Sequence, residues 1–577
     1  MPFFRLQSSS RAGWCRLWQA HFETSKGCSL IRMMFNFTRQ TKSRNPGSSL
    51  LRLAIAPCLT AALLLSGCAI SPISPEERAK NALSSLQLTS AQGVVSLKMT
   101  SNRARVSTYF SQWTRLRVKN LETSDLTSLS NRSDSIENHS LFVGALPAGT
   151  YEIHSVESSA SGMATLTSFA DASDAFPGFA VAAGQLTDLG TIAFIRKHYP
   201  VDSREFRWGI APEASFDRQA ILRRLNPALR DQLSVRPVLG WSDGDRLRAR
   251  RKTHDQFLGL TMRAASPVLQ PDGSALFGES FGQIAVRSAQ GTWSFLQTPT
   301  SQPIRSLHVS RGGELYAGSD NGLLMVRRTA TGNWESIALP ANDSSVIHVG
   351  PLPGSTDVLV VLQTSDRFLG LSIDAAADRP LKEQFSKPRA LFANPMNDVR
   401  GYVLEASSQV LFAMGGFQSK TEVLKYSSAD PIWKDVSSGD ENVPSNWASL
   451  NDGSVGRFAG IPMTGMYFTT SQDNGKSWER RGDLNWANGS LLFVSQKVGY
   501  VIRLDSRAAF DPELIEQSVW RTNDAGHTWS LAGSPKTIGG TLVALGGTEK
   551  IGYVGLNGRF MVSLDGGKTW RAERVLP

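Results

Sequence analysis

The sequence predicts an all-β protein: a seven-bladed β-propeller that follows a small β-sandwich domain and an N-terminal signal peptide. Three observations lead to this prediction. The chain of 577 residues contains 50 Gly and 14 Trp, which suits many tight turns between strands. Short stretches of alternating or β-branched apolar residues run through most of the chain. After about position 255, one pattern of four such stretches recurs every 41 to 51 residues.

Residues 1–67 are interpreted as the signal peptide, with 33–67 as its ordinary leader and 1–32 as an upstream extension. Basic residues precede an apolar stretch over 53–65, and the small residues Ser66 and Gly67 follow it. A positive region, a short apolar region and a small-residue cleavage site together define a secretory signal. The apolar stretch is too short to span a bilayer comfortably.

The segment from Leu65 to Cys68, Leu-Ser-Gly-Cys, resembles the lipobox of bacterial lipoproteins. The resemblance implies cleavage before Cys68, followed by lipidation of its sulfur and acylation of its new amino group. Several acyl chains anchor a protein stably in a membrane. In that family, Ala69 rather than Asp at the next position favours the outer membrane. We therefore expect a lipid-anchored protein of the bacterial outer membrane that faces the periplasm, with 68–89 as anchor and spacer.

Positive charge and cysteine are both concentrated at the N terminus. Residues 1–67 contain nine Lys and Arg and one Glu, which accounts for eight of the eleven net positive charges. The rest of the chain is nearly neutral, so nucleic acid is not an expected partner. All four cysteines lie within the first 68 residues. The folded body therefore contains no disulfide, thiolate metal ligand or Cys nucleophile.

The segment 90–200 is predicted to be the β-sandwich. Its strand-like stretches are separated by turn signals such as those at 147–149 and 183–184. Two of its stretches, "LPAGTYEI" and "AAGQLTDLGTIAF", resemble the ends of small transthyretin-like or carboxypeptidase-regulatory β-sandwiches. The segment shows no His, Asp and Glu cluster with metal-ligand spacing. We expect a β-sandwich that contributes no catalytic or metal-binding site.

The segment 201–254 is predicted to be a partly helical linker. Apolar residues between 215 and 229 follow helical spacing, which Pro227 interrupts. Five basic residues then occur between Arg246 and Lys252. Such a run is usually a solvated surface. Contact with anionic lipid head groups is the alternative.

The repeat occupies 255–577, and its clearest copy spans 304–340. Each unit is expected to contain four strands, with an aromatic residue at the start of the fourth. Four strands per unit at this period predict a β-propeller. The sequence does not predict how the propeller closes, although residues 256–262 could supply an exchanged strand. The aromatic markers of the seven units are Trp293, Trp334, Phe385, Trp433, Trp478, Trp529 and Trp570.

Three units contain the eight-residue pattern Ser/Thr-x-Asp-x-Gly-x-Ser/Thr-Trp, at 471–478, 522–529 and 563–570. The pattern suits a turn: the Asp can accept N–H bonds within the loop, and the Gly permits positive φ. The Trp can fill the gap between units. Four of the seven units lack the Asp, so it is not required for catalysis. The residues given this structural role are Ser471, Asp473, Gly475, Trp478, Thr522, Asp524, Gly526, Trp529, Ser563, Asp565, Gly567 and Trp570.

This pattern resembles the Asp-box, or bacterial neuraminidase repeat. In Asp-box families the box lies between the third and fourth strands, on the face away from the active site. The resemblance therefore implies a structural role. A metal site is the alternative, but one carboxylate per unit supplies too few hard ligands for Ca²⁺. No metal and no cofactor is expected.

The Asp-boxes also raise the question of sialidase activity. A sialidase-like site needs three arginines that clamp a carboxylate, a Tyr nucleophile with a supporting Glu, and an acid/base Asp. The Phe/Tyr-Arg-Ile-Pro string of that family is absent, and the nearest string, at 303–305, has the wrong order. The plant and cyanobacterial photosystem II assembly-factor family, which binds protein through seven blades with such boxes, is a better resemblance. No catalytic residue is assigned.

We therefore expect a non-catalytic scaffold of the cell envelope that binds a protein or a glycan through the propeller. A sialidase-like glycoside hydrolase with a divergent active site is the alternative, and a spacer without a ligand is a third possibility. Long loops on a rigid scaffold tend to carry binding. The loops at 505–518 and 457–465 are the two candidates. The residues singled out in the first are Asp505, Arg507, Asp511 and Glu513.

Overall fold

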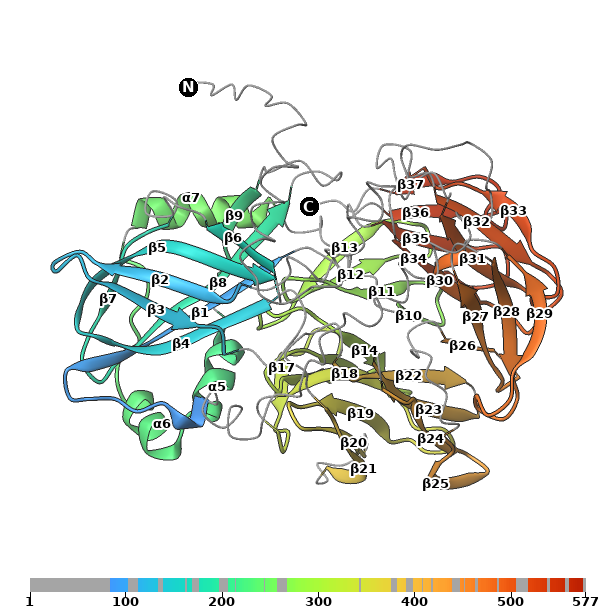
Figure 1. The fold of residues 1–577 in the computed structure, drawn as a ribbon, viewed down its shortest axis with the longest axis horizontal. Coiled ribbons are helices and arrows are strands. Elements are labelled where there is room, and N and C mark those ends of the chain that lie inside the picture. Colours follow the sequence, from blue (N-terminus) through green and yellow to red (C-terminus); the bar gives the residue numbers. More distant parts are fainter. Residues whose placement is uncertain are drawn as a thin grey trace, which may run out of the picture. The chain divides into compact units, whose positions relative to one another are not determined.

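The structure is a computed structural model (Figure 1). It describes residues 83–577 except 102–112, 133–138, 161–162, 169–175, 197–205, 213, 243, 257–266, 342–343, 375–380, 391–397, 407, 417–418, 438–446, 451, 462–464, 485–486, 505–516, 537–539, 556–559 and 574–577. Within these residues almost every element is a strand, so the all-β prediction is confirmed. None of the described helices is long and apolar enough to span a bilayer.

The N-terminal part of the described chain begins with the short 3₁₀ helix η2 (Leu83–Ser85) and contains two β-sheets. One sheet has the order β4 (His139–Pro147), β1 (Gln92–Ser101), β8 (Leu186–Arg196) and β9 (Phe206–Ile210). The other has the order β3 (Leu126–Ser130), β2 (Arg115–Asn120), β5 (Gly149–Ala160) and β6 (Met163–Ser168), and β7 (Phe179–Val181) pairs with β5.

The two N-terminal sheets share one apolar core. Val95, Leu97 and Met99 of β1 pack in the same cluster as Leu116 and Val118 of β2. Side chains of a strand point alternately to its two faces, so these β1 residues define one face of the strand. The polar residues between them therefore lie on its other face. That second face contributes to the candidate site described below.

Three helices follow: α5 (Ser215–Arg224), α6 (Pro227–Ser234) and α7 (Gly244–Asp255). Pro227 begins α6, because the first helical position needs neither an N–H donor nor a free φ. The Asn226 side chain caps this helix by accepting the Leu229 N–H at 2.9 Å. Ile221 of α5 and Leu233 of α6 share an apolar cluster with strand residues of the first N-terminal sheet. These two helices are therefore packed on a sheet.

The basic run predicted between Arg246 and Lys252 lies in α7. Leu247 packs against the N-terminal core and His254 is buried, which fixes one face of the helix inward. The exposed residues of α7 include three basic and two acidic side chains, Arg246, Arg248, Lys252, Asp245 and Asp255. Arg250 and Arg251 are half-buried, so α7 as a whole contains five basic and two acidic side chains.

Seven four-stranded sheets follow in chain order, each antiparallel throughout, within the part of the chain that the structure describes. The first four are β10 (Val268–Leu269), β11 (Ala275–Gly278), β12 (Gln283–Arg287) and β13 (Trp293–Gln297); β14 (Ser306–Val309), β15 (Leu315–Gly318), β16 (Leu324–Arg327) and β17 (Trp334–Ile337); β18 (Ser345–Pro351), β19 (Val358–Gln363), β20 (Arg367–Ile373) and β21 (Lys382–Pro388); and β22 (Arg400–Ala406), β23 (Gln409–Gly415), β24 (Glu422–Ser427) and β25 (Asp430–Asp435). The last three are β26 (Trp447–Ser449), β27 (Val455–Ile461), β28 (Gly465–Ser471) and β29 (Glu479–Asp483); β30 (Ala487–Phe493), β31 (Gly499–Leu504), β32 (Gln517–Thr522) and β33 (Ser530–Gly533); and β34 (Gly540–Ala544), β35 (Ile551–Gly555), β36 (Phe560–Ser563) and β37 (Arg571–Glu573).

These sheets form a closed ring. Apolar clusters join each sheet to the next. A further cluster joins the first sheet to the last, where Phe277 of β11 packs with Val543 and Phe560. At the same contact the Arg287 guanidinium lies 2.8 Å from the Glu573 carboxylate. Such a ring of four-stranded sheets is the arrangement of a β-propeller, as the repeat predicts. The suggested closing segment 256–262 lies almost wholly outside the described residues.

The seven aromatic markers fall in or directly before the fourth strand of their sheets, and five of them lie at its start, as predicted. Trp293 and Trp334 are the first residues of β13 and β17. Phe385 and Trp433 lie within β21 and β25. The Trp of each eight-residue box comes directly before the fourth strand of its sheet. The interval between successive aromatic markers along the sequence therefore matches the interval between successive sheets.

Candidate functional site

Several predicted site residues cannot be placed, because they lie outside the described residues. These are Cys68 with its lipobox, and Asp505, Arg507, Asp511 and Glu513 of the first candidate binding loop. The second candidate loop, 457–465, is corrected by the structure. Its residues 457–461 belong to β27, and residue 465 begins β28. Arg457 pairs with Thr469 across the hairpin, so ladder bonding holds most of this stretch as strand.

The eight-residue boxes form tight turns held by one set of hydrogen bonds. In the last copy the Ser563 hydroxyl donates to Asp565 Oδ1 at 2.8 Å and accepts the Gly567 N–H at 2.7 Å. Thr569 donates its N–H to Asp565 Oδ1 at 2.9 Å and its hydroxyl to Oδ2 at 2.6 Å. The boxes at 471–478 and 522–529 contain the same four bonds.

Both oxygens of each box carboxylate are therefore occupied within the turn. Hydrogen bonds from Ser477 hold the pKa of Asp473 at about 2, and those from Thr569 hold the pKa of Asp565 at about 2. Gly567 has a φ of 90°, the left-handed region that glycine adopts without strain. In the described residues no group of three or more His, Asp and Glu side chains is arranged to hold a metal ion.

The box tryptophans pack between neighbouring sheets. The Trp529 ring lies 5.7 Å from that of Phe468, on the preceding sheet, and 6.3 Å from that of Phe493. Its indole N–H donates to the Gly526 carbonyl at 3.1 Å, within its own turn. Trp478 is held differently, because the Arg457 guanidinium lies 3.7 Å from its ring centroid.

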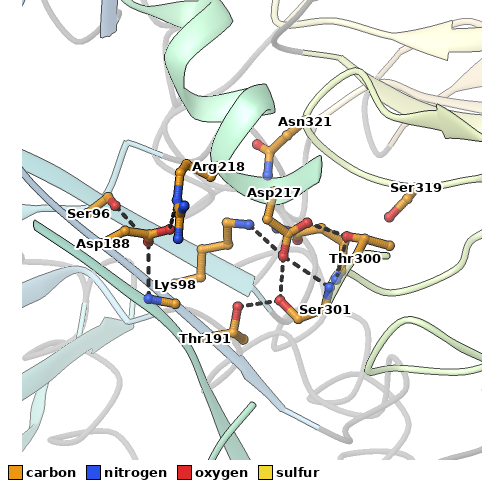
Figure 2. Close-up of polar contacts among 12 residues, drawn as sticks. Ser96, Lys98, Asp188, Thr191, Asp217, Arg218, Thr300, Ser301, Ser319 and Asn321 are labelled. Atoms are coloured by element: carbon orange, nitrogen blue, oxygen red, sulfur yellow. Dashed lines mark hydrogen bonds and ion pairs between the residues drawn. The ribbon is translucent and has the colours of Figure 1, made fainter. Parts of the chain in front are cut away.

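A buried polar cluster joins the N-terminal part of the chain to the ring (Figure 2). We call it the junction cluster; it consists of Lys98, Thr191, Asp217, Thr300 and Ser301. Lys98 Nζ lies 2.9 Å from Asp217 Oδ2, and the two side chains are 3% and 8% exposed. Asp217 also accepts the Ser301 N–H at 3.0 Å and the hydroxyls of Ser301 and Thr300. Thr191 and Ser301 share a hydroxyl hydrogen bond of 2.5 Å.

The local sequence explains how these groups meet. Lys98 lies between Ser96 and Thr100 on β1, so all three point away from the apolar face of that strand. Asp217 lies in the first turn of α5, where the helix dipole favours a carboxylate. Thr300 and Ser301 belong to the connection between the first and second sheets of the ring. One carboxylate therefore holds β1, α5 and the ring together.

Further polar contacts extend from the junction cluster (Figure 2). Asp188 of β8 accepts the Ser96 hydroxyl at 2.9 Å and the Arg218 Nε–H at 3.3 Å. At the other end of α5, Arg224 donates to the Asn321 side chain of the ring at 2.9 Å. The helix therefore contacts the ring near both of its ends.

The junction cluster is suited to holding two parts of a chain rather than to catalysis. Ser301 is 5% exposed, and its hydroxyl is engaged with Asp217 and Thr191. The Asp217 carboxylate accepts hydrogen bonds from Thr300 and Ser301 beside its ion pair with Lys98, and a buried pair held in this way fixes the geometry of the groups it joins. Sequence reasoning missed this cluster. The only local signal was one lysine among the alternating residues of β1.

Two arginines and one tyrosine of the ring that could be considered for a sialidase-like site are engaged in structural contacts. Arg305, in the string nearest to the family pattern, forms a buried ion pair with Asp320. Arg287 pairs with Glu573, as described above. The Tyr500 hydroxyl donates to the Thr548 carbonyl at 2.7 Å, and burial raises the pKa of Tyr500 to about 12.

Comparisons with known proteins give similarity only at the level of three-dimensional structure. No protein-family model matches the chain, and no curated protein matches it. YCF48 from Cyanidioschyzon merolae matches at 12% identity over 53% of this chain and 97% of its own, with a TM-score of 0.38. The Cps50 (Swd1) β-propeller domain of Myceliophteria thermophila matches at 11% identity over 52% and 95%, with a TM-score of 0.36. Streptogramin B lyase matches at 12% identity over 53% and 93%, with a TM-score of 0.35. Similarity this weak carries no inference about function.

Proposed function

We propose that this chain is a non-catalytic binding scaffold of the bacterial cell envelope, lipid-anchored at Cys68 in the outer membrane and facing the periplasm. In this proposal a seven-bladed Asp-box β-propeller, preceded by a small β-sandwich, binds a protein or a glycan. The leader and lipobox support the anchor. The seven sheets and the shared bonding of the three boxes support the Asp-box assignment.

The junction cluster is the observation that carries this proposal. Two domains of one chain move relative to each other by default unless their interface is extensive. Here a buried lysine and a buried aspartate bind the ring to β1 and α5. An anchored protein that must present a binding surface in a fixed position benefits from such a connection. Arg287, Arg305 and Tyr500 are engaged in structural contacts, and the described residues give no observation that specifically favours the hydrolase alternative.

Affinity capture tests the proposal. The intact lipoprotein is crosslinked in cells, purified in detergent and analysed for bound protein and glycan. One variant replaces 505–516, the part of the candidate loop that precedes β32, by a short Gly/Ser linker, and a control replaces 375–380, which connects β20 to β21. We expect a discrete partner that is lost from the first variant and retained by the control. Cys68→Ala should release the chain from the membrane fraction.

The two kinds of partner give different results in the same experiment. A protein that copurifies stoichiometrically supports a protein partner. Binding on a glycan array without a copurifying protein supports a glycan. Absence of both, or equal capture by the two loop variants, contradicts the proposed binding function. Failure of Cys68→Ala to change membrane association contradicts the anchor independently.

A further inference from the structure

The first strands of successive sheets lie at the centre of the ring. Contacts run from β10 to β14, from β14 to β18, from β18 to β22, and on through β26 and β30 to β34. We call these seven first strands the axial strands. Three of them bring ionisable side chains close to one another: His308 on β14, His348 on β18 and Glu405 on β22.

His348 and Glu405 form a contact between the third and fourth sheets. His348 Nε2 lies 3.2 Å from Glu405 Oε1. The His348 side chain is 12% exposed, whereas that of Glu405 is 43% exposed. Gly350 makes room for this contact, because a Cβ there would lie 2.2 Å from Glu405 Oε1 and 2.6 Å from His348 Nε2. A solvent-accessible carboxylate therefore lies among the axial strands, beside a nearly buried imidazole.

Glu405 differs in its ionic partner from four enclosed carboxylates of the ring and the junction. Each of these four has a Lys or Arg partner: Lys98 for Asp217, Arg287 for Glu573, Arg305 for Asp320 and Arg389 for Asp398. Within the described part of the chain, the ion-pair partner found for Glu405 is His348 alone. Arg400, on the same strand, is five residues away, or about 16 Å along a strand at roughly 3.3 Å per residue.

The His348 imidazole cannot serve as a cationic partner for Glu405 at neutral pH. Burial, with a smaller contribution from the neighbouring His308, lowers the pKa of His348 to about 3. Burial also lowers the pKa of His308. Tyr316 on β15 has a raised pKa, and β23 and β26 have no titratable residue. On β22 itself, the remaining titratable residues are Arg400 and Tyr402. The cluster of His308, His348 and Glu405 therefore carries at most one negative charge, that of Glu405.

We propose that Glu405 and His348 form a binding site for one organic cation, either a primary ammonium or a guanidinium group. The cation would donate hydrogen bonds to the Glu405 carboxylate and to Nε2 of the neutral His348 imidazole. Charge-assisted bonds of this kind are stronger than bonds between neutral groups. The site does not depend on the lipid anchor or on the loop at 505–518, so it goes beyond the proposed function.

The proposed site also predicts a coupling between cation binding and proton release. Although 43% of its side-chain surface is exposed, Glu405 lies within the ring, where the surrounding strands limit its hydration. This desolvation raises the pKa of Glu405 to about 7, so near neutrality the carboxyl group is partly protonated. A cation binds the ionised form and releases the remaining proton. For a group with this pKa, the apparent dissociation constant is about tenfold higher at pH 6 than at pH 8.

Isothermal titration calorimetry on the full lipoprotein in detergent tests the site. Cadaverine and arginine amide are the small probes, and a peptide with one Lys and one Arg is the third. We expect Glu405→Gln to weaken binding at least tenfold at pH 8, and wild-type binding to weaken about tenfold at pH 6. Glu383→Gln removes the same charge from the exposed outer strand β21 and should leave binding unchanged.

Each outcome bears on the proposal. Tighter binding of the peptide than of the free amines assigns the cation to a protein side chain, and equal binding assigns it to a small amine. Both support the site. Binding that survives Glu405→Gln, that is lost equally in Glu383→Gln, or that is equal at pH 6 and pH 8 overturns it. Gln has the shape of a protonated Glu, and a thermal melt followed by circular dichroism checks that the variant is folded.

Discussion

Replacement of Lys98 by Met should weaken the connection between the N-terminal part of the chain and the ring. The substitution keeps most of the side-chain volume but leaves the buried Asp217 carboxylate without its cation. Removing one partner of a buried pair costs about 3–5 kcal/mol. Asp217 still accepts hydrogen bonds from Thr300 and Ser301, so we expect a value near the lower end, about 3 kcal/mol.

Urea unfolding of wild type and Lys98→Met measures this loss of stability, and calorimetry shows whether one transition becomes two. Lys382→Met, at an exposed position of β21, is the control and should change stability by less than about 0.5 kcal/mol. The double variant Lys98→Met/Asp217→Asn removes both charges, keeps an acceptor for the Ser301 N–H and should recover part of the loss. If Lys98→Met is no more destabilising than the control, or if the double variant loses the sum of two large effects, the reasoning is wrong.

Three further predictions concern the box turns and the axial contact. Asp565→Ala removes the acceptor of three hydrogen bonds in the last box and should lower the free energy of unfolding in urea by about 1–2 kcal/mol. The control Asp231→Ala, at an exposed position of α6, should cost less. Equal effects of the two substitutions would contradict the role of Asp565 in the turn. Gly350→Ala should cost about 1–3 kcal/mol, because its Cβ would lie 2.6 Å from Nε2 and 2.8 Å from Cε1 of the nearly buried His348 ring. Gly312→Ala, with no atom nearer than 3.6 Å, should be tolerated, and similar thermal midpoints for the two variants would contradict the close packing. The raised pKa of Glu405 means that its contribution to stability is greatest below pH 4.5 and is lost as the pH rises through about 7. The free energy of unfolding of Glu405→Gln should therefore equal that of wild type near pH 4 and exceed it by about 1–2 kcal/mol at pH 8, after allowance for solvent screening. A stability difference between the two proteins that does not change with pH would refute this sign.

The lowered pKa of His348 acts on stability in the opposite direction. Its folded-state pKa of about 3 lies below the ordinary 6.5, so the contribution of the neutral imidazole is present above pH 6.5 and is lost as the pH falls towards 3. Between pH 4.5 and 6.5 the two groups therefore change stability in opposite directions. The Glu405→Gln comparison isolates the carboxyl part of this profile.

The ring could be predicted from sequence because its signals are local. Each sheet repeats the same order of strand, glycine turn and aromatic residue within about 45 residues, so Trp293 and Trp570 reported the positions of the first and last fourth strands. The box chemistry was also local, since Ser563, Asp565 and Thr569 bond only within their own turn.

The junction cluster and the axial pair could not be predicted, because their partners are distant in sequence. Lys98 reads as one polar residue in an alternating strand until α5 brings Asp217 beside it. His348 and Glu405 meet only when the ring places β18 beside β22. The stretch 457–465 was misjudged for a different reason. The sequence prediction treats it as a loop, but the pairing of Arg457 with Thr469 keeps most of it in a hairpin.

Photocrosslinking in cells tests the binding function most directly. A photoreactive amino acid is placed at Asp511, within the candidate binding loop, and at Glu383 on the outer strand of the third sheet as a control. The proposed scaffold predicts a discrete crosslinked protein or glycan adduct from position 511 and none from position 383. Absence of an adduct from position 511, in a chain shown to be folded and membrane-anchored, would contradict it.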